Sequence, residues 1–352
     1  MAEKKEIAPP ALPAQLPGLL LDWFAVNARS LPWRRDREPY HVWLSEIMLQ
    51  QTRVQAVLGY YARFLQALPD IPALAACPED RLLKLWEGLG YYSRVRNLQK
   101  AARVICEEYG GVFPADYRAI RGLPGIGDYT AGAIASICFE QPRAAVDGNV
   151  LRVITRLTGD DTPVEQPAFR KAVAAALEEL YPAGQCGAFT QALMELGALV
   201  CVPNGAPLCH RCPLAGLCRA KAEGRTGALP VKGAKKPRRK EQLTVLLLWC
   251  GDKLALCRRP ESGLLAGLWQ LPNLPGELTV EQALAQAAEW GAEPHHPETV
   301  VHRSHIFTHV EWEMTGISIR CNREAEGFTW ADREARAGEY ALPTAFRQFL
   351  EE

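Results

Sequence analysis

Long apolar runs are missing from this sequence of 352 residues, and their absence limits what the chain can be. No run of about 18 apolar residues occurs, which excludes a membrane-spanning helix. The first residues, MAEKKEIAPPALPAQLPG, include basic side chains but no apolar segment as long as a secretory signal requires. We therefore expect a cytoplasmic protein with no membrane partner, in which residues 1–18 form a disordered tail.

The chain also lacks a net charge, because 40 Lys and Arg residues balance 40 Asp and Glu residues. A neutral total does not exclude binding to nucleic acid, since such binding needs a basic face and not a basic total. Hydrophobic residues make up 48% of the chain, enough for a sizeable core. The length favours two domains.

Alternating strand patterns are absent from the first half of the chain. Residues 19–220 carry helical spacing instead, and the apolar residues of Ser45–Leu68 predict a helix over that range. Residues 221–240 are rich in Gly, Pro and basic side chains, which is typical of an exposed linker. Residues 241–352 contain β-branched and alternating segments. We therefore predict a mainly α-helical domain followed by an α+β domain with a sheet.

The eleven cysteines are an odd number, and most are scattered as small buried residues would be in a reducing compartment. Four of them form a group, Cys201, Cys209, Cys212 and Cys218, with seven, two and five residues between them. Four thiolates on so short a segment can enclose one tetrahedral centre. The spacing alone leaves both zinc and an iron–sulfur cluster open.

Three further features suggest an anion-binding turn and acid–base chemistry. The turn Leu123–Gly127 opens a helix, and free N–H groups at such a turn bind phosphate. Glu46 has apolar neighbours that favour its protonated form, whereas Asp147 precedes a helix whose dipole favours the ionised form. Two carboxyl groups in different environments suit cleavage of a glycosidic bond. The plainer alternatives are that Asp147 is only an N-cap and Glu46 only a first-turn acid.

Six motifs in one order resemble the MutY-type adenine DNA glycosylases, which belong to the helix-hairpin-helix superfamily together with endonuclease III. They are LPWR (31–34), SEIMLQQTRV (45–54), EGLGYYSRVRNL (87–98), LPGIGDYTAGAI (123–134), VDGNVLRV (146–153) and the cysteine group. The resemblance implies a helix-hairpin-helix glycosylase domain with an iron–sulfur loop over residues 19–220, and a Nudix-like domain that recognises 8-oxoguanine over residues 241–352. It also implies a bacterial-type, nucleoid-associated monomer that removes adenine opposite 8-oxoguanine or G from double-stranded DNA in base excision repair.

The resemblance implies roles for individual residues. Glu46 would protonate adenine, and Asp147 would stabilise the sugar cation with Asn149 as its hydrogen-bond partner. The adenine pocket would comprise Arg29, Leu31, Trp33, Arg34, Leu49 and Gln191. DNA would be contacted by Gln51, Leu89, Tyr91, Leu123, Gly125 and Gly127, with Gln51 and Tyr91 filling the gap that a flipped base leaves. A 4Fe–4S cluster would be held by Cys201, Cys209, Cys212 and Cys218, although the family usually has six residues in the first interval and this chain has seven.

A lysine is missing at the position where relatives that resemble endonuclease III carry one, and Tyr129 stands there instead. The lysine amine of those enzymes attacks the sugar and forms a Schiff base, which a phenol cannot do. We therefore expect base removal without strand cleavage. In this interpretation Tyr129 donates a hydrogen bond to Asp147 and shields the cationic sugar.

In EQALAQAAEWG (281–291), alanines such as Ala285 and Ala288 stand at positions where the resemblance to Nudix hydrolases would require acids to bind a divalent metal. Phe307, Thr308 and His309 stand where the family reads 8-oxoguanine with a Phe-Ser-His loop. Recognition without hydrolysis is the resulting prediction. The alternatives are an endonuclease III-like pyrimidine glycosylase and lyase, a non-catalytic damage-binding protein, and a Nudix-type nucleotide hydrolase.

Overall fold

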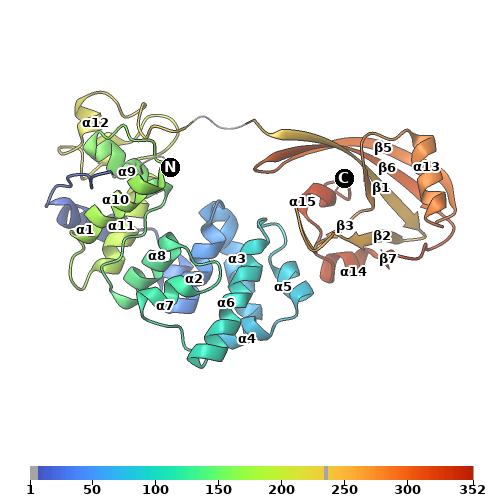
Figure 1. The fold of residues 1–352 in the computed structure, drawn as a ribbon, viewed down its shortest axis with the longest axis horizontal. Helices are drawn as coiled ribbons and strands as arrows, with labels where there is room; N and C mark the ends of the chain where they lie inside the picture. Colours follow the sequence, from blue (N-terminus) through green and yellow to red (C-terminus); the bar gives the residue numbers. More distant parts are fainter. Residues whose placement is uncertain (1–6, 234–236, 352) are drawn as a thin grey trace, which may run out of the picture. The chain divides into compact units, whose positions relative to one another are not determined.

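The computed structural model describes residues 7–233 and 237–351, and its chain divides into two compact units (Figure 1). The first unit comprises Met1–Ala75 and Asn97–Ala234, and the second comprises Ala76–Arg96 and Lys235–Glu352. Within the described ranges, no helix has both the length and the apolar character needed to cross a bilayer.

The first unit is helical, which confirms the predicted class of the first half. Its helices are α1 (Leu16–Asn27), α2 (Pro39–Leu49), α3 (Val54–Ala67), α4 (Ile71–Ala76), α6 (Ser93–Tyr109), α7 (Tyr117–Gly122), α8 (Asp128–Phe139), α9 (Gly148–Thr158), α10 (Pro167–Glu178), α11 (Cys186–Leu199) and α12 (Arg219–Ala222), with α4 and α6 each crossing a boundary between the units. Helix α1 begins inside the segment predicted to be a disordered tail, because Leu16 and Leu20 are fully buried against α9, α10 and α11.

The helix predicted over Ser45–Leu68 is two helices in the structure, so that prediction was wrong. Helix α2 ends at Leu49 and α3 begins at Val54. Gln51 adopts φ +58°, a left-handed conformation that interrupts an α-helix. The apolar spacing continues across the break, so periodicity alone did not reveal it. Gln51 therefore follows the end of α2, the helix that carries Glu46, and both residues line the same cavity.

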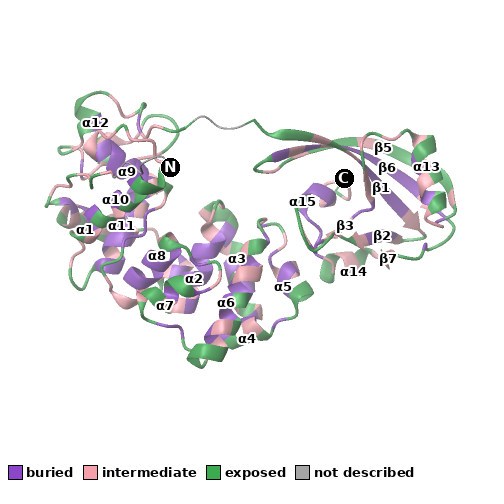
Figure 2. Ribbon diagram, viewed as in Figure 1, coloured by how far each residue is buried: buried purple, intermediate pink, exposed green. Residues whose placement is uncertain are grey.

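Helix α2 is buried on nearly every side, as the purple ribbon in Figure 2 illustrates. Its buried residues include Trp43, Leu44, Glu46 and Met48. A helix that is apolar all round can be stable only inside a core. Glu46 is therefore carried into the interior by its neighbours, which places an acidic group where water is scarce.

The hairpin α7–turn–α8 forms as the glycines of the turn predict. Asp116 caps α7 by accepting a hydrogen bond from the Ala119 N–H at 2.9 Å. Gly125 has φ +77°, and a Cβ there would come within 2.6 Å of the Asn97 side chain. Only glycine satisfies both conditions. The turn leads directly into the first turn of α8, where Tyr129 lies.

Three other glycines let backbones approach closely around the same helices. A Cβ on Gly132 would lie 2.4 Å from the Ala144 carbonyl oxygen. A Cβ on Gly187 would lie 2.9 Å from the Ile137 Cα atom, and one on Gly197 would lie 2.6 Å from the Asn149 Cβ atom. Helix α8 thus packs closely against α11 and against the segment before α9, and α9 packs closely against α11.

The second unit is α+β, as predicted, and its strands form one mixed sheet in the order β3-β2-β1-β6-β5. The strands are β1 (Arg239–Cys250), β2 (Lys253–Arg258), β3 (Trp269–Gln270), β4 (Asn273–Pro275), β5 (Pro294–Ile306), β6 (Val310–Cys321) and β7 (Thr329–Ala331), and the helices are α5 (Glu79–Leu85), α13 (Val280–Glu289), α14 (Arg333–Gly338) and α15 (Thr344–Arg347). Strand β1 pairs in parallel with β6 and antiparallel with β2 and β4. It begins at Arg239, inside the predicted linker, which also overlaps α12.

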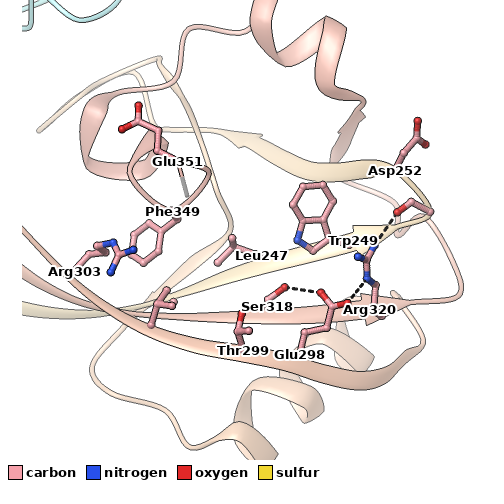
Figure 3. Close-up of a pocket in the computed structure, with 13 residues that line it drawn as sticks. Leu247, Trp249, Asp252, Glu298, Thr299, Arg303, Ser318, Arg320, Phe349 and Glu351 are labelled. Atoms are coloured by element: carbon pink, nitrogen blue, oxygen red, sulfur yellow. Dashed lines mark hydrogen bonds and ion pairs between the residues drawn. The ribbon is translucent and has the colours of Figure 1, made fainter.

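Each face of this sheet has its own core. Ala283 and Ala287 of α13 pack on one face, and Phe346 of α15 packs on the other. The face that α15 covers also bears a cavity of about 740 Å³, with Trp249 and Phe349 on its walls and Arg303 beside Phe349 (Figure 3). None of the residues predicted to read 8-oxoguanine lines this cavity.

Candidate active site

One cavity of the first unit gathers most of the predicted site residues. It has a volume of about 890 Å³ and is enclosed by α2, α8, α9, α11 and the segment before α2. The predicted residues that line it are Arg29, Leu31, Trp33, Arg34, Glu46, Leu49, Gln51, Gly125, Gly127, Tyr129, Asp147, Asn149 and Gln191. Predicted residues from five separate sequence segments therefore meet at one concave site, as an active site requires.

Glu46 of α2 lies in the wall of this cavity. Its side chain is 7% exposed, and burial raises the pKa of its carboxyl group to about 7. The Tyr129 hydroxyl donates a hydrogen bond of 2.6 Å to Glu46 Oε2, which opposes the shift, while the nearby Asp147 charge adds to it. A carboxyl group with a pKa near 7 can hold a proton at neutral pH and still release it to a substrate.

The predicted hydrogen bond from Tyr129 to Asp147 is wrong, because the phenol binds Glu46 instead. Tyr129 lies one turn into α8, opposite the buried helix that presents Glu46, and sequence spacing did not indicate which carboxyl group it would face. Burial raises the pKa of the Tyr129 hydroxyl well above its usual range, and both carboxyl groups add to this effect. The phenol therefore remains a neutral hydrogen-bond donor.

Asp147 is both the N-cap of α9 and part of the cavity wall. Its Oδ1 accepts a hydrogen bond from the Val150 N–H at 2.7 Å, and its Oδ2 accepts one from Asn149 Nδ2 at 2.8 Å. The helix dipole was expected to favour the ionised form, but burial outweighs the hydrogen bonds and raises the pKa of Asp147. A half-buried carboxylate of this kind gains from a cation that forms beside it.

Arg152 connects Asn149 to the loop that carries the cysteines. Its guanidinium donates to Asn149 Oδ1 at 2.8 Å, to the Gly197 carbonyl at 2.7 Å and to the Cys201 carbonyl at 2.7 Å. Asn149 in turn donates to Asp147. Asp147 is thus fixed through Asn149 and Arg152 by the end of α11 and by the start of the cysteine loop.

Glu195 is a site residue that sequence reasoning missed. Its side chain is fully buried, and it binds Arg29 at 2.7 Å and Arg34 at 2.9 Å. Burial alone would raise the pKa of Glu195, but the hydrogen bonds from the two arginines hold it at about 2. Arg29 and Arg34 do line the cavity, as predicted, with their charges already partnered. The sequence feature that could have revealed Glu195 is its position as the single acid in the largely apolar segment around Gln191.

Glutamine in place of Glu195 is expected to lower the melting temperature of the first unit by about 6–12 °C at neutral pH, because two arginines lose a buried partner. Thermal unfolding measures this. Glu195 stabilises the fold above its unfolded pKa, so the difference from the parent should shrink as pH falls from about 4.5 towards 2. Glu223→Gln, which removes exposed ion pairs with Arg219 and Arg225, is the control and should change the melting temperature little.

The predicted DNA-contacting residues divide between the units. Gln51, Gly125 and Gly127 line the cavity of the first unit, whereas Leu123, the residue after α7, is 4% exposed. Leu89 and Tyr91 belong to the second unit. Leu89 is 7% exposed, and the neighbouring Tyr92 is buried, as expected for a packing aromatic residue. Tyr91 is 46% exposed and adopts φ +48°.

Phe307, Thr308 and His309 form the connection between β5 and β6. The Phe307 N–H donates to the Val310 carbonyl at 2.8 Å, which closes the turn. Phe307 packs against Trp312 with ring centroids 4.8 Å apart, so its ring serves the core. The Thr308 Oγ1 lies 2.8 Å from the Tyr91 hydroxyl, a residue of the same unit. Two residues predicted to meet DNA at the lesion therefore already contact each other.

The four grouped cysteines lie on the loop between α11 and α12, each half-buried. Cys201 Sγ accepts a hydrogen bond from Arg156 at 3.3 Å, and Cys218 donates one to the Arg156 carbonyl at 3.3 Å. Burial raises the pKa of Cys212 to about 11, and the other three thiols add to it. Across residues 7–233 and 237–351, no three Cys, His or acidic side chains are placed to share one metal ion.

Comparison with known proteins gives the family. Residues 44–182 match the family described as HhH-GPD superfamily base excision DNA repair protein, and residues 244–352 match the NUDIX domain. An adenine DNA glycosylase of Rattus norvegicus is 33% identical over 94% of this chain and 77% of that protein. One from Buchnera aphidicola subsp. Acyrthosiphon pisum is 32% identical over 88% of each. The chain belongs to the adenine DNA glycosylase family.

Solved structures resemble the helical part of this glycosylase. A thermostable thymine-DNA glycosylase is 30% identical over 58% of the chain and 94% of its own, with a TM-score of 0.54. Endonuclease III in a non-covalent complex with DNA is 25% identical over 61% of the chain and 99% of its own, with a TM-score of 0.51. The glycosylase is thus a hydrolase of N-glycosyl bonds, and duplex DNA is its partner.

Proposed function

We propose that this adenine DNA glycosylase removes adenine paired with 8-oxoguanine or G and leaves the DNA strand intact. The observation that carries the proposal is a pair of carboxyl groups in one cavity, the buried Glu46 with a pKa of about 7 and the half-buried Asp147 held at a helix N-terminus. Cleavage of a glycosidic bond needs a proton on the leaving group and a negative charge near the sugar cation. These two residues supply one each.

Glu46 protonates the flipped adenine, and Tyr129 holds the carboxyl group in place through its hydrogen bond. Asp147 stabilises the oxocarbenium-like sugar, with Asn149 and Val150 fixing its two oxygens. The side chains of Leu31, Trp33, Leu49 and Gln191, together with the Arg29–Glu195–Arg34 ion pairs, supply walls for the base. Exclusion of water by these walls strengthens both electrostatic effects.

The absence of an amine in the cavity supports base removal without lyase chemistry. No lysine lines it among the described residues, and the side chain opposite Glu46 is the neutral phenol of Tyr129. A Schiff base with the sugar requires a primary amine. The rival function, an endonuclease III-like pyrimidine glycosylase and lyase, therefore lacks its nucleophile in this cavity.

Single-turnover base release tests the proposal. The substrates are duplexes that carry one adenine opposite 8-oxoguanine, G or T, and the products are analysed with and without alkali. We expect release opposite 8-oxoguanine and G, none opposite T, and a strand break only after alkali. Strand cleavage without alkali would establish a lyase, and tight binding without release would establish the damage-binding alternative.

Phenylalanine in place of Tyr129 is expected to shift the alkaline limb of the pH–rate profile upwards by roughly one pH unit. In the parent, the hydrogen bond from Tyr129 lowers the pKa of Glu46. Without this bond, Glu46 keeps its proton to higher pH. Tyr181→Phe, which removes a buried hydroxyl bound to Thr190 at 2.8 Å, is the matched control and should leave the profile in place. A downward shift in Tyr129→Phe would contradict the assignment.

We propose that Cys201, Cys209, Cys212 and Cys218 hold a 4Fe–4S cluster. The number and type of donors fit, since four half-buried thiols lie on one loop and Arg156 already contacts two of them. Such a cluster supplies a rigid anchor for the loop when bound. Analysis of iron and acid-labile sulfide in the purified protein tests the assignment, and stoichiometric zinc would replace it.

We also propose that Phe307, Thr308 and His309 read the damaged base from the second unit, and that a monomer acts at the cytoplasmic nucleoid. The hydroxyl of Thr308 supports the first part, because it supplies a donor and an acceptor at the tip of the β5–β6 hairpin. Helix α13 exposes Ala285 and Ala288, which cannot bind metal, so this unit is proposed to recognise and not to hydrolyse. Turnover of 8-oxo-dGTP would contradict that.

A further inference from the structure

Tyr91 is presented on an unusual turn. Gly88, Gly90 and Tyr91 all have positive φ, at 98°, 68° and 48°. Glycine adopts such values freely, but a tyrosine adopts them rarely. Something must therefore hold Tyr91 in this conformation, with its ring 46% exposed at the surface.

Arg94 contacts this turn at several points. Its guanidinium donates to the Leu89 carbonyl at 3.0 Å and to the Gly90 carbonyl at 3.1 Å. Trp86 Nε1 donates to the same Gly90 carbonyl at 3.0 Å. The Arg94 Cζ atom also lies 5.3 Å from the ring centroid of Trp86 and 5.5 Å from that of Tyr91. The guanidinium thus contacts both the backbone of the turn and the ring it presents.

We infer that Arg94 is a positioning residue that presents Tyr91 for insertion into the base stack before DNA binds. The inference rests on the proposed function, in which Tyr91 fills part of the gap left by the flipped adenine. A planar guanidinium can donate to two adjacent carbonyls and stack on aromatic rings at once, whereas a lysine ammonium is a point charge. Burial lowers the pKa of Arg94 to about 10, so the group stays charged at neutral pH.

Arg94→Met and Arg94→Lys test this inference on two duplexes. In the first, adenine lies opposite 8-oxoguanine in a continuous stack, and in the second it lies opposite an abasic site, where no base needs to be displaced. We expect both variants to release adenine about tenfold more slowly or worse on the first duplex and within about threefold of the parent on the second. Equal losses on both duplexes would mean a general structural defect and would overturn the inference.

Two controls sharpen the test. Arg103→Lys changes an arginine of the same helix, α6, that donates to the Ala75 carbonyl at 3.1 Å, and it should match the parent on both duplexes. Tyr91→Ala should reproduce the loss seen with Arg94→Met, and the double variant should lose no more than either single one, because both changes disable one element. Additive losses would contradict a role for Arg94 through Tyr91.

A fluorescence measurement separates this inference from the proposed function. 2-Aminopurine placed next to the 8-oxoguanine reports a change of stacking on binding and needs no base release. We expect the parent to change this fluorescence and Arg94→Met to change it less than half as much. An unchanged response in Arg94→Met would overturn the inference whether or not adenine is released. Failure of release alone, with the fluorescence difference intact, would count against the proposed chemistry only.

Discussion

Asparagine in place of Asp147 is expected to slow base release by a factor on the order of 10³ while leaving DNA binding intact. Asparagine keeps the shape of the side chain and an oxygen for the Val150 N–H, so α9 remains capped. It removes the negative charge that faces the sugar cation. It also places an amide donor against Asn149 Nδ2, where the carboxylate accepted a hydrogen bond. Single-turnover kinetics measures the loss.

Asp116→Asn is the matched control, since Asp116 caps α7 in the same manner but is exposed and does not line the cavity. It should leave the rate of base release within about twofold of the parent, because a surface substitution of this kind has a small effect. If the two asparagine variants behaved alike, Asp147 would be an N-cap and nothing more.

Glutamine in place of Glu46 is expected to slow base release by about 10²–10⁴-fold, the usual contribution of a general acid. In the parent, the rate should fall as pH rises through about 7, because Glu46 then loses the proton that adenine needs. The variant has no such group, so its residual rate should lose this dependence. A parent profile that stays flat between pH 6 and 9 would remove Glu46 as the acid.

The same substitution has an expected effect of opposite sign on stability. The pKa of Glu46 is raised from its ordinary 4.5 to about 7 in the folded state, so folding loses stability as pH rises through that interval. The cost above pH 7 is about 3 kcal/mol. Glu46→Gln should therefore unfold at a higher urea concentration than the parent at pH 8. Loss of activity together with a gain in stability identifies a group kept for chemistry.

Sequence reasoning located the parts of this site but not how they connect. Glu46, Asp147 and Tyr129 were predicted because each lies in a motif with a recognisable residue pattern. The partner of Tyr129 was predicted wrongly, since it depends on which face of α2 turns towards α8 in the folded unit. Glu195 was missed for the same reason, as its two arginines lie more than 160 residues away in the chain.

Two further errors, the unbroken helix over Ser45–Leu68 and the expected ionisation of Asp147, have physical causes that residue patterns do not record. The break between α2 and α3 lies at Gln51, where no glycine or proline marks the left-handed residue. The pKa of Asp147 was expected to follow the helix dipole, a local effect, but the depth of burial decides it. Fold class, by contrast, depends on long repeated patterns, and these predicted a helical half and a sheet-containing half correctly.

The close backbone contacts at Gly132, Gly187 and Gly197 bear on how variants of this family should be ranked. A methyl group at any of these positions would collide with backbone or with Asn149. Exchange of glycine for alanine scores as conservative on any scale of chemical similarity, yet here it would displace the helices that carry Tyr129 and Asp147. Such scales will therefore underestimate the loss of stability and activity that alanine causes at these three glycines, because the spacing of the helices leaves no room for one more carbon atom.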